Sequence, residues 1–171
     1  MKHSKIIFFL VIIGLSLVLS SHYLSSKDNV EIFVSKSGPY IGVNYQQKLG
    51  YDGTGIKIAV IDTGVDYNHP DLFGFGPDGK VIGGYDFVDN DKTPFDTNGH
   101  GTEVAGIIAA DGTISGMAPK AKLLAYRVSD TGESVSSDLI VKAIEQAIID
   151  KADIINISLG VNKTNKIIDD S

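Results

Sequence analysis

The chain has 171 residues, of which 43% are hydrophobic, a formal net charge of −6 and no cysteine. This length suits one folded core rather than two domains. The acidic residues are scattered and no basic cluster accompanies them, which argues against nucleic acid as a partner. The lack of cysteine excludes disulfides, thiolate metal sites and a cysteine nucleophile.

The N-terminus carries the pattern of a targeting segment. Three basic residues, Lys2, His3 and Lys5, lie at the start of the chain, and the run 6–19, IIFFLVIIGLSLVL, is apolar or small throughout. Such a run matches the 7 to 15 or so residues of a signal-peptide core and is shorter than the roughly 20 needed to span a bilayer. Extended to Leu24, it would make a marginal anchor. We therefore expect residues 1–25 to be a signal peptide or an N-terminal membrane anchor, so that the protein is exported and is either secreted or attached to the membrane through residues 6–24.

Residues 26–55 are polar and glycine-rich, which predicts a lead-in segment without a regular element. Three short apolar runs follow, IKIAVI (56–61), KLLAYRV (122–128) and DIINIS (153–158). They are rich in β-branched residues and do not alternate with polar ones, which is typical of strands buried on both faces.

A helix is predicted between the second and third runs. In residues 136–151, alanine, leucine and isoleucine recur at four-residue spacing, and Ser136 or Ser137 offers an N-cap oxygen. A strand, helix and strand of this length imply a parallel sheet with right-handed crossovers. The predicted fold class is therefore α/β.

Two residues stand where such folds place their chemistry. Asp62 directly follows the first run, at the carboxyl end of a buried strand, although an isolated Asp there is also a common loop cap. His100 lies between Gly99 and Gly101 at the start of a small-residue helix. A neighbouring carboxylate shifts a histidine pKa by about 1 to 3 units, which outweighs the roughly 0.3 to 1 kcal/mol effect of the helix dipole. A histidine oriented by Asp62 would be a base near neutral pH, and the alternative is a purely structural histidine.

Four motifs carry a resemblance to a known family. They are VIDTGVDYNHPDL (60–72), NGHGTEVAGIIAA (98–110), GMAPKAKLLAYRV (116–128) and ADIINISLG (152–160). In this order they resemble the subtilisin-like serine proteases, the subtilases of peptidase family S8, from about Gly38 to the C-terminus.

The resemblance implies a three-layer parallel-sheet fold and hydrolysis of peptide bonds in a protein or peptide substrate, with residues 56–171 as the first half of the catalytic domain. It also implies that Asp62 orients the imidazole and that His100 is the general base and acid. Three further residues would pair with the substrate backbone: Ser158, Leu159 and Gly160.

The chain departs from the family pattern at the nucleophile. The family's serine lies in a later G-T-S-M-A-x-P motif, and Asn156 and Asn162 do not occupy the motif of its oxyanion-binding asparagine. GTISGMAPK (112–120) imitates the serine motif, but we reject Ser115 because it falls between the histidine helix and the next strand. We therefore expect a truncated serine endopeptidase that carries the aspartate and histidine only. The alternatives are an inert pseudoenzyme and half of a split protease that a second chain completes.

The sequence predicts no cofactor. Asp71 resembles one calcium ligand of the family, but the loop AADGTISGMAP is short for a calcium site. Glu103 stands where the family often has a second histidine. A metal-dependent hydrolase is the remaining alternative, with His100 and Glu103 on one helical face, completed from the group His69, Asp66 and Asp71, although Val104 replaces the histidine that an inverted zinc motif requires.

Overall fold

The computed structural model describes residues 37–132 and 135–159 of the chain. Within them, four strands form one parallel sheet in the order β2-β3-β1-β4. The strands are β1 (Lys57–Asp62), β2 (Val81–Asp86), β3 (Lys122–Arg127) and β4 (Ile154–Ile157). The helices are α2 (Val43–Lys48), the short 3-10 helix η1 (Pro70–Leu72), α3 (His100–Ala109) and α4 (Ser137–Ile149). The predicted α/β class is confirmed.

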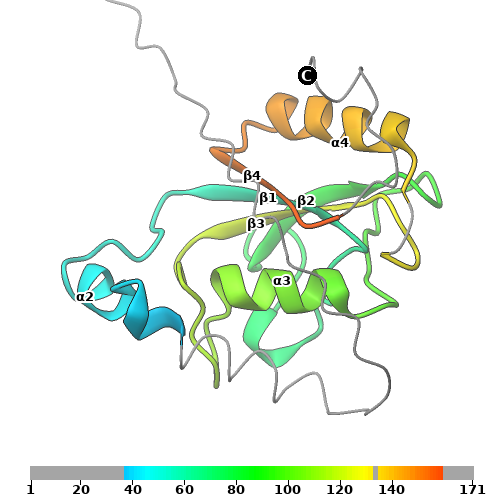
Figure 1. Ribbon diagram of the computed structural model, residues 1–171. Helices are drawn as coiled ribbons and strands as arrows, with labels where there is room; N and C mark the ends of the chain where they lie inside the picture. Colours follow the sequence, from blue (N-terminus) through cyan, green and yellow to red (C-terminus); the bar gives the residue numbers. More distant parts are fainter. Residues whose placement is uncertain (1–36, 133–134, 160–171) are drawn as a thin grey trace, which may run out of the picture.

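The sheet is the middle of three layers, with α4 on one face and α3 on the other (Figure 1). Successive side chains of β1 point to opposite faces. Ile58 and Val60 belong to the core on the α3 side, whereas Ala59 and Ile61 belong to the core on the α4 side. This double burial explains why the run lacks polar alternation.

The two crossovers that contain α3 and α4 have opposite hands. The connections from β2 to β3 and from β3 to β4 step across the sheet in the same direction, the first through α3 and the second through α4. Because α3 and α4 cover opposite faces, one connection is left-handed, which is rare in parallel sheets. The expectation of right-handed crossovers was drawn from the unit of β3, α4 and β4, and it does not hold for both connections.

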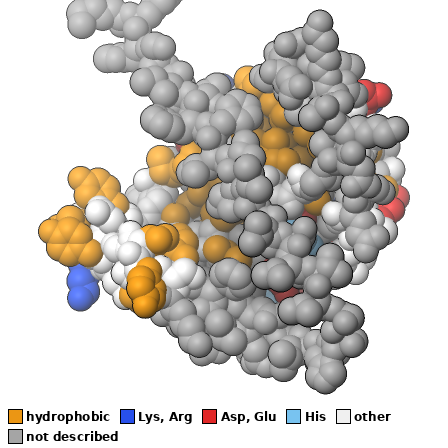
Figure 2. All heavy atoms as spheres, in the orientation of Figure 1, with side chains coloured by type: hydrophobic (Ala, Val, Ile, Leu, Met, Phe, Trp, Pro, Cys, Tyr) orange, Lys and Arg blue, Asp and Glu red, His pale blue; other side chains and the backbone are white. Residues whose placement is uncertain are grey.

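Besides the short η1, two elements were not predicted. β2 was missed because its sequence, VIGGYD, contains two glycines and is only partly buried along its middle. The expectation of an irregular lead-in is wrong at α2, which is tied to the body by the Gln47 side chain; its Nε2 donates to the carbonyls of Gly116 and Met117. The hydrophobic side chains around α2 are exposed and form an orange group at the left of Figure 2; they include Tyr40, Ile41, Tyr45, Leu49 and Tyr51.

The N-cap of α4 also differs from the expectation. Ser136 occupies the N-cap position, but its side chain makes no capping hydrogen bond; its backbone carbonyl accepts from the amides of Leu139 and Ile140. The segment 1–25 lies outside the described residues. Among the residues that are described, no helix is long and apolar enough to cross a bilayer.

Candidate functional site

Asp62 and His100 meet at one edge of the sheet. Asp62 ends β1, and His100 is the first residue of α3. The imidazole Nδ1 lies 2.7 Å from Asp62 Oδ1, the distance of a strong, charge-assisted hydrogen bond. The Asp62 carboxylate is completely buried, whereas the His100 side chain is 44% exposed. The pair therefore has a fixed acid on the inside and an accessible base on the outside.

Two glycines let the histidine come this close to β1. A side chain at Gly101 would place its Cβ 2.1 Å from the Gly64 carbonyl oxygen and 3.1 Å from Asp62 Cβ. Gly99, on the other side of His100, has a φ of +109°, a conformation that L residues rarely adopt. The glycines that flank His100 in the sequence are thus explained by close approach at one position and by backbone conformation at the other.

The hydrogen bond to Asp62 raises the pKa of His100 above its ordinary value, and nearby negative charge on Asp62, Glu103 and Asp96 adds to this; partial burial opposes it. The upward direction of the pKa shift is the one that the sequence predicts for a histidine beside Asp62. An imidazole in this setting holds a proton at Nδ1 toward the acid and is stabilised when it gains a second one.

The two carboxylate oxygens of Asp62 have different surroundings. Oδ1 accepts from His100 Nδ1 and from the Thr63 amide, at 2.7 Å each. Oδ2 is buried and has no hydrogen-bond partner among the described residues. Burial of the carboxylate strengthens its interaction with the imidazolium, because charges attract more strongly in a medium of low dielectric constant.

Asp96 is a polar residue of this corner that the sequence reasoning did not single out. It is buried and lies in the loop before α3, where it contacts both Thr63, the residue after Asp62, and Thr102 in the first turn of α3. Its signal in the sequence is the spacing D-x-N-G before His100, which is typical of an aspartate that bonds backbone amides two and three residues on.

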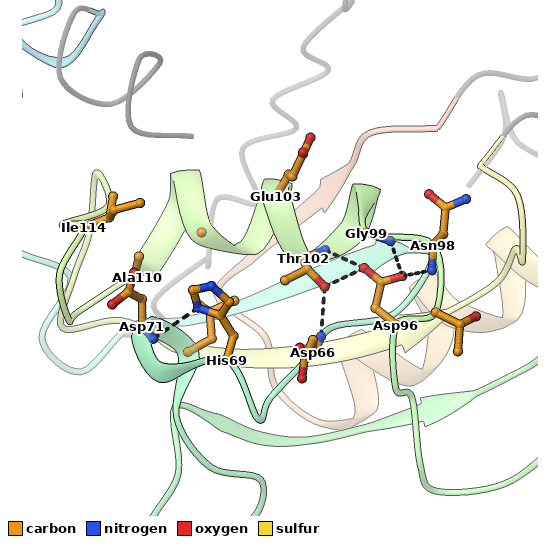
Figure 3. A pocket seen from close by; sticks show the side chains of 13 residues that line it. Asp66, His69, Asp71, Asp96, Asn98, Gly99, Thr102, Glu103, Ala110 and Ile114 are labelled. Carbon is orange, nitrogen blue, oxygen red and sulfur yellow. Dashed lines mark hydrogen bonds between the residues drawn. The ribbon is translucent and has the colours of Figure 1, made fainter. Parts of the chain in front are cut away.

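A cleft of about 280 Å³ lies beside α3 and is lined in part by acidic residues (Figure 3). Glu103 is one of them, and burial raises the pKa of its carboxyl. His69 lines it too, but its Nδ1 accepts from the Asp71 amide and so caps η1. No group of three acidic or imidazole side chains that could hold a metal ion occurs within 37–132 and 135–159. Four residues of the metal-hydrolase alternative share the lining of this cleft without forming such a group: Asp66, His69, Asp71 and Glu103.

The carboxylate of Asp71, the residue that resembles a calcium ligand of the family, is held by the turn that follows α3. Its Oδ1 accepts from the Thr113 amide at 2.6 Å, and a Cβ built on Gly112 would lie 2.1 Å from the same oxygen. The turn 111–115 thus lies directly against the carboxylate and holds one of its oxygens.

The predicted substrate-pairing residues follow β4. Ile157 is opposite Ile61 in the register of β4 with β1, so Ser158 is level with Asp62 one strand away. The Ser158 hydroxyl accepts from Asn156 Nδ2 at 2.9 Å. Leu159 packs against the core on the α4 side, and Gly160 lies outside the described residues. Their role in substrate binding stays a prediction.

Ser115 lies past the far end of α3. The ten residues of α3 span about 15 Å, with His100 at the first and Ser115 beyond the last. The segment that contains it closes the helix: the amides of Gly116, Met117 and Ala118 donate to the final carbonyls of α3 and its C-cap. Its neighbours therefore cap a helix C-terminus, as the position of this motif in the sequence indicates.

Known proteins share this sequence over most of its length. A model of the subtilase family matches residues 53–170. The minor extracellular protease Vpr of Bacillus subtilis (strain 168) is 49% identical over 150 residues, covering 82% of this chain and 18% of that protein. The thermophilic serine proteinase of Bacillus sp. (strain AK1) is 54% identical over 121 residues, covering 68% of this chain and 29% of that protein. Thermitase of Thermoactinomyces vulgaris is 50% identical over 113 residues, covering 64% of this chain and 39% of that protein.

Proposed function

The chain belongs to the subtilase family, and on that premise we propose that Asp62 orients the imidazole of His100 and that His100 is the general base and acid of a serine endopeptidase. The observation that carries the proposal is the 2.7 Å contact between His100 Nδ1 and the buried Asp62 Oδ1. Serine triads on unrelated folds use the same contact, in which the carboxylate fixes the tautomer and stabilises the imidazolium.

In the proposed reaction, His100 Nε2 removes the proton from a serine hydroxyl as the serine oxygen attacks the peptide carbonyl. The imidazolium then gives that proton to the leaving amine, and water regenerates the serine. Asp62 remains ionised throughout. His100 Nε2 can take and give this proton because it lies on the far side of the ring from Nδ1. Nδ1 faces the buried Asp62 carboxylate, and the side chain as a whole is partly exposed.

The serine is proposed to come from outside the described residues. The chain spans less than half the length of the three relatives named above. We propose that the nucleophile and the oxyanion donor belong either to a further part of the same protein or to a second chain. An inert pseudoenzyme is the competing proposal, because removal of the nucleophile alone abolishes most of the rate of such an enzyme.

Substrate and location follow from the same premise. A protein or peptide would pair its backbone with Ser158, Leu159 and Gly160, next to the strand that ends at Asp62. The relative named as an extracellular protease supports export of this chain, with residues 1–25 as signal peptide or anchor.

Complementation tests the proposal. The chain is mixed with a separately produced C-terminal part of the Bacillus subtilis relative, taken beyond the matched region, and treated with a serine-directed fluorophosphonate. We expect the complementing serine to be labelled and a peptide to be cleaved, and His100→Ala or Asp62→Asn to abolish both. Ser115→Ala is the matched control and leaves both unchanged. Labelling of this chain at Ser115, or labelling that is indifferent to His100, would refute the proposal.

A further inference from the structure

We propose that Thr63 and Asp96 form a positioning unit that holds His100 against Asp62. This inference rests on the proposed function, because it assigns to two residues outside the pair the task of setting its geometry. Both residues act through the backbone on either side of the imidazole.

Thr63 links the two halves of the pair. It follows Asp62, and its amide donates to Asp62 Oδ1 at 2.7 Å. Its hydroxyl accepts from the amide of Gly101, the residue after His100, at 2.9 Å. The same hydroxyl donates to Asp96 Oδ1 at 3.0 Å. One buried hydroxyl therefore connects the end of β1 to the start of α3.

Asp96 holds the other side of the histidine. Its Oδ1 accepts from the amides of Asn98 and Gly99 at 2.9 and 3.0 Å, and its Oδ2 accepts from the Thr102 amide at 2.9 Å and the Thr102 hydroxyl at 2.5 Å. Thr102 in turn accepts from the Asp66 amide at 2.9 Å (Figure 3). The carboxylate thus ties the residues before His100 to Thr102 in the first turn of α3, while it is itself only 5% exposed.

The local sequence makes such a unit necessary. The neighbours of His100 are both glycines, which have no side chain to pack and give the backbone wide freedom. Their amides are the groups that Thr63 and Asp96 hold. Without these acceptors, buried amides would lose their partners, and the turn would move to recover them.

The competing explanation is that Thr63 and Asp96 only cap the start of α3 and have no effect on the pair of Asp62 and His100. A second buried carboxylate, that of Asp86, allows the two explanations to be compared. Asp86 is also buried, and it accepts from two backbone amides, those of Val88 and Asp89, and pairs with Arg127. It ends β2, at the strand farthest from β4 in the sheet. Asp86 is level with Asp62 in the sheet, two strands away, and the amides that it holds do not flank the histidine. Asp86→Asn therefore removes the same kind of charge and the same kind of hydrogen bonds without touching the turn that carries His100.

The decisive variants carry no change of charge. Asp62, Asp96 and Glu103 all raise the pKa of His100 through their charge, so loss of Asp96 would lower that pKa even without movement. Thr63→Val removes the hydroxyl and keeps the shape, whereas Thr63→Ser restores the hydroxyl. We expect Thr63→Val to lower the His100 pKa and to speed exchange of the Nδ1 proton, and Thr63→Ser to resemble the native chain.

NMR titration of His100 in the whole 171-residue chain measures this. Asp96→Asn should match Thr63→Val in proton exchange, and Asp86→Asn should lower stability while it leaves the His100 signals unchanged. An unchanged Nδ1 exchange rate in Thr63→Val, or equal changes in Asp86→Asn, would overturn the inference. Should Thr63→Val fail to fold, Asp96→Asn compared with Asp86→Asn decides: faster Nδ1 exchange in the first alone supports the unit, and equal rates overturn it.

Activity in the complemented protease gives a second readout. A displacement of the base of about 1 Å costs on the order of 100-fold, so we expect Thr63→Val to lower kcat by about 10- to 100-fold with little change in KM. Thr63→Ser should retain most of the native kcat, because it keeps the hydroxyl. A complemented protein that cleaves nothing refutes the proposed function but leaves the NMR result intact, so the two failures are distinguishable.

Discussion

The two faces of the sheet are built on different principles. On one face, α4 packs isoleucine and alanine side chains onto Ala59 and Ile61, and its N-cap makes no side-chain hydrogen bond. On the other face, α3 fully buries only glycine and alanine, with Val104 and Ile108 packed partly against the core, and hydrogen bonds fasten both of its ends. Apolar area dominates the packing of α4, although its C-cap also receives two hydrogen bonds, whereas α3 combines a smaller apolar contact with polar contacts at both ends.

The difference matches what each helix carries. Apolar packing gives stability and tolerates small shifts, because it has no preferred direction. Hydrogen bonds fix distance and angle, which a pair of reacting side chains requires. The histidine stands on the helix that is held by directional contacts. The predictions below test this contrast.

Gly101→Ala should have the largest effect. Its Cβ would meet the Gly64 carbonyl, a backbone atom that no side-chain rotation can move away. We expect the free energy of unfolding to fall by about 4 kcal/mol and the contact of His100 with Asp62 to break. Urea denaturation followed by circular dichroism measures this. Gly99→Ala is the control, since a Cβ there meets nothing within 4 Å; it should cost about 1 to 2 kcal/mol for backbone strain alone. Equal losses in the two variants would contradict the close-approach explanation.

Ile144→Ala tests the other face. Ile144 is buried in the core between α4 and the sheet, and its truncation should cost about 3 kcal/mol in unfolding free energy. The His100 titration should not change, because α3 does not rely on this core. Ile148→Ala on the same helix, at a side chain that is 54% exposed, should change the unfolding free energy by less than about 0.5 kcal/mol. A shift of the His100 pKa in Ile144→Ala would show that the two faces are coupled.

Asp62→Asn removes the main cause of the raised His100 pKa. We expect that pKa to fall toward its ordinary value, as followed by NMR of the imidazole protons. Glu103→Gln removes a smaller contribution and should lower the same pKa less. If Glu103→Gln lowered the His100 pKa more than Asp62→Asn does, the assignment of Asp62 as the orienting residue would be wrong.

The smallest effect is the pH dependence of stability. The pKa of His100 is raised on folding, so the folded chain binds this proton more tightly than the unfolded chain. The resulting stability is complete below the ordinary histidine pKa of about 6.5 and is lost as the pH rises through the folded value. Urea midpoints should therefore fall across that window, and modestly, because the side chain is partly exposed. The fall of the urea midpoint with rising pH should vanish in His100→Gln. If the midpoint still fell in that variant, the pH dependence would belong to another titrating group.

The layers of the fold could largely be predicted from local pattern. Runs of β-branched residues predicted β1, β3 and β4, and four-residue spacing predicted α4, because both signals depend only on neighbouring side chains. β2 escaped because Gly83 and Gly84 remove that signal. α2 escaped because its six residues are too few for a clear helical period, and its own Gln47 side chain anchors it to a distant segment.

The sequence by itself determined the strands β1, β3 and β4 and the α4 helix, since each depends on its immediate neighbours. It also pointed to Asp62 and His100, through the order of the motifs that contain them. Tertiary structure alone decided that Asp62 and His100, 38 residues apart, come within hydrogen-bond distance. It also decided that Asp96 and Thr63 hold the turn between them, and that one crossover has the rare hand. The apolar periodicity of a helix or strand can be recognised within one segment of the sequence. A buried hydrogen bond between two segments forms only once both segments have folded into place.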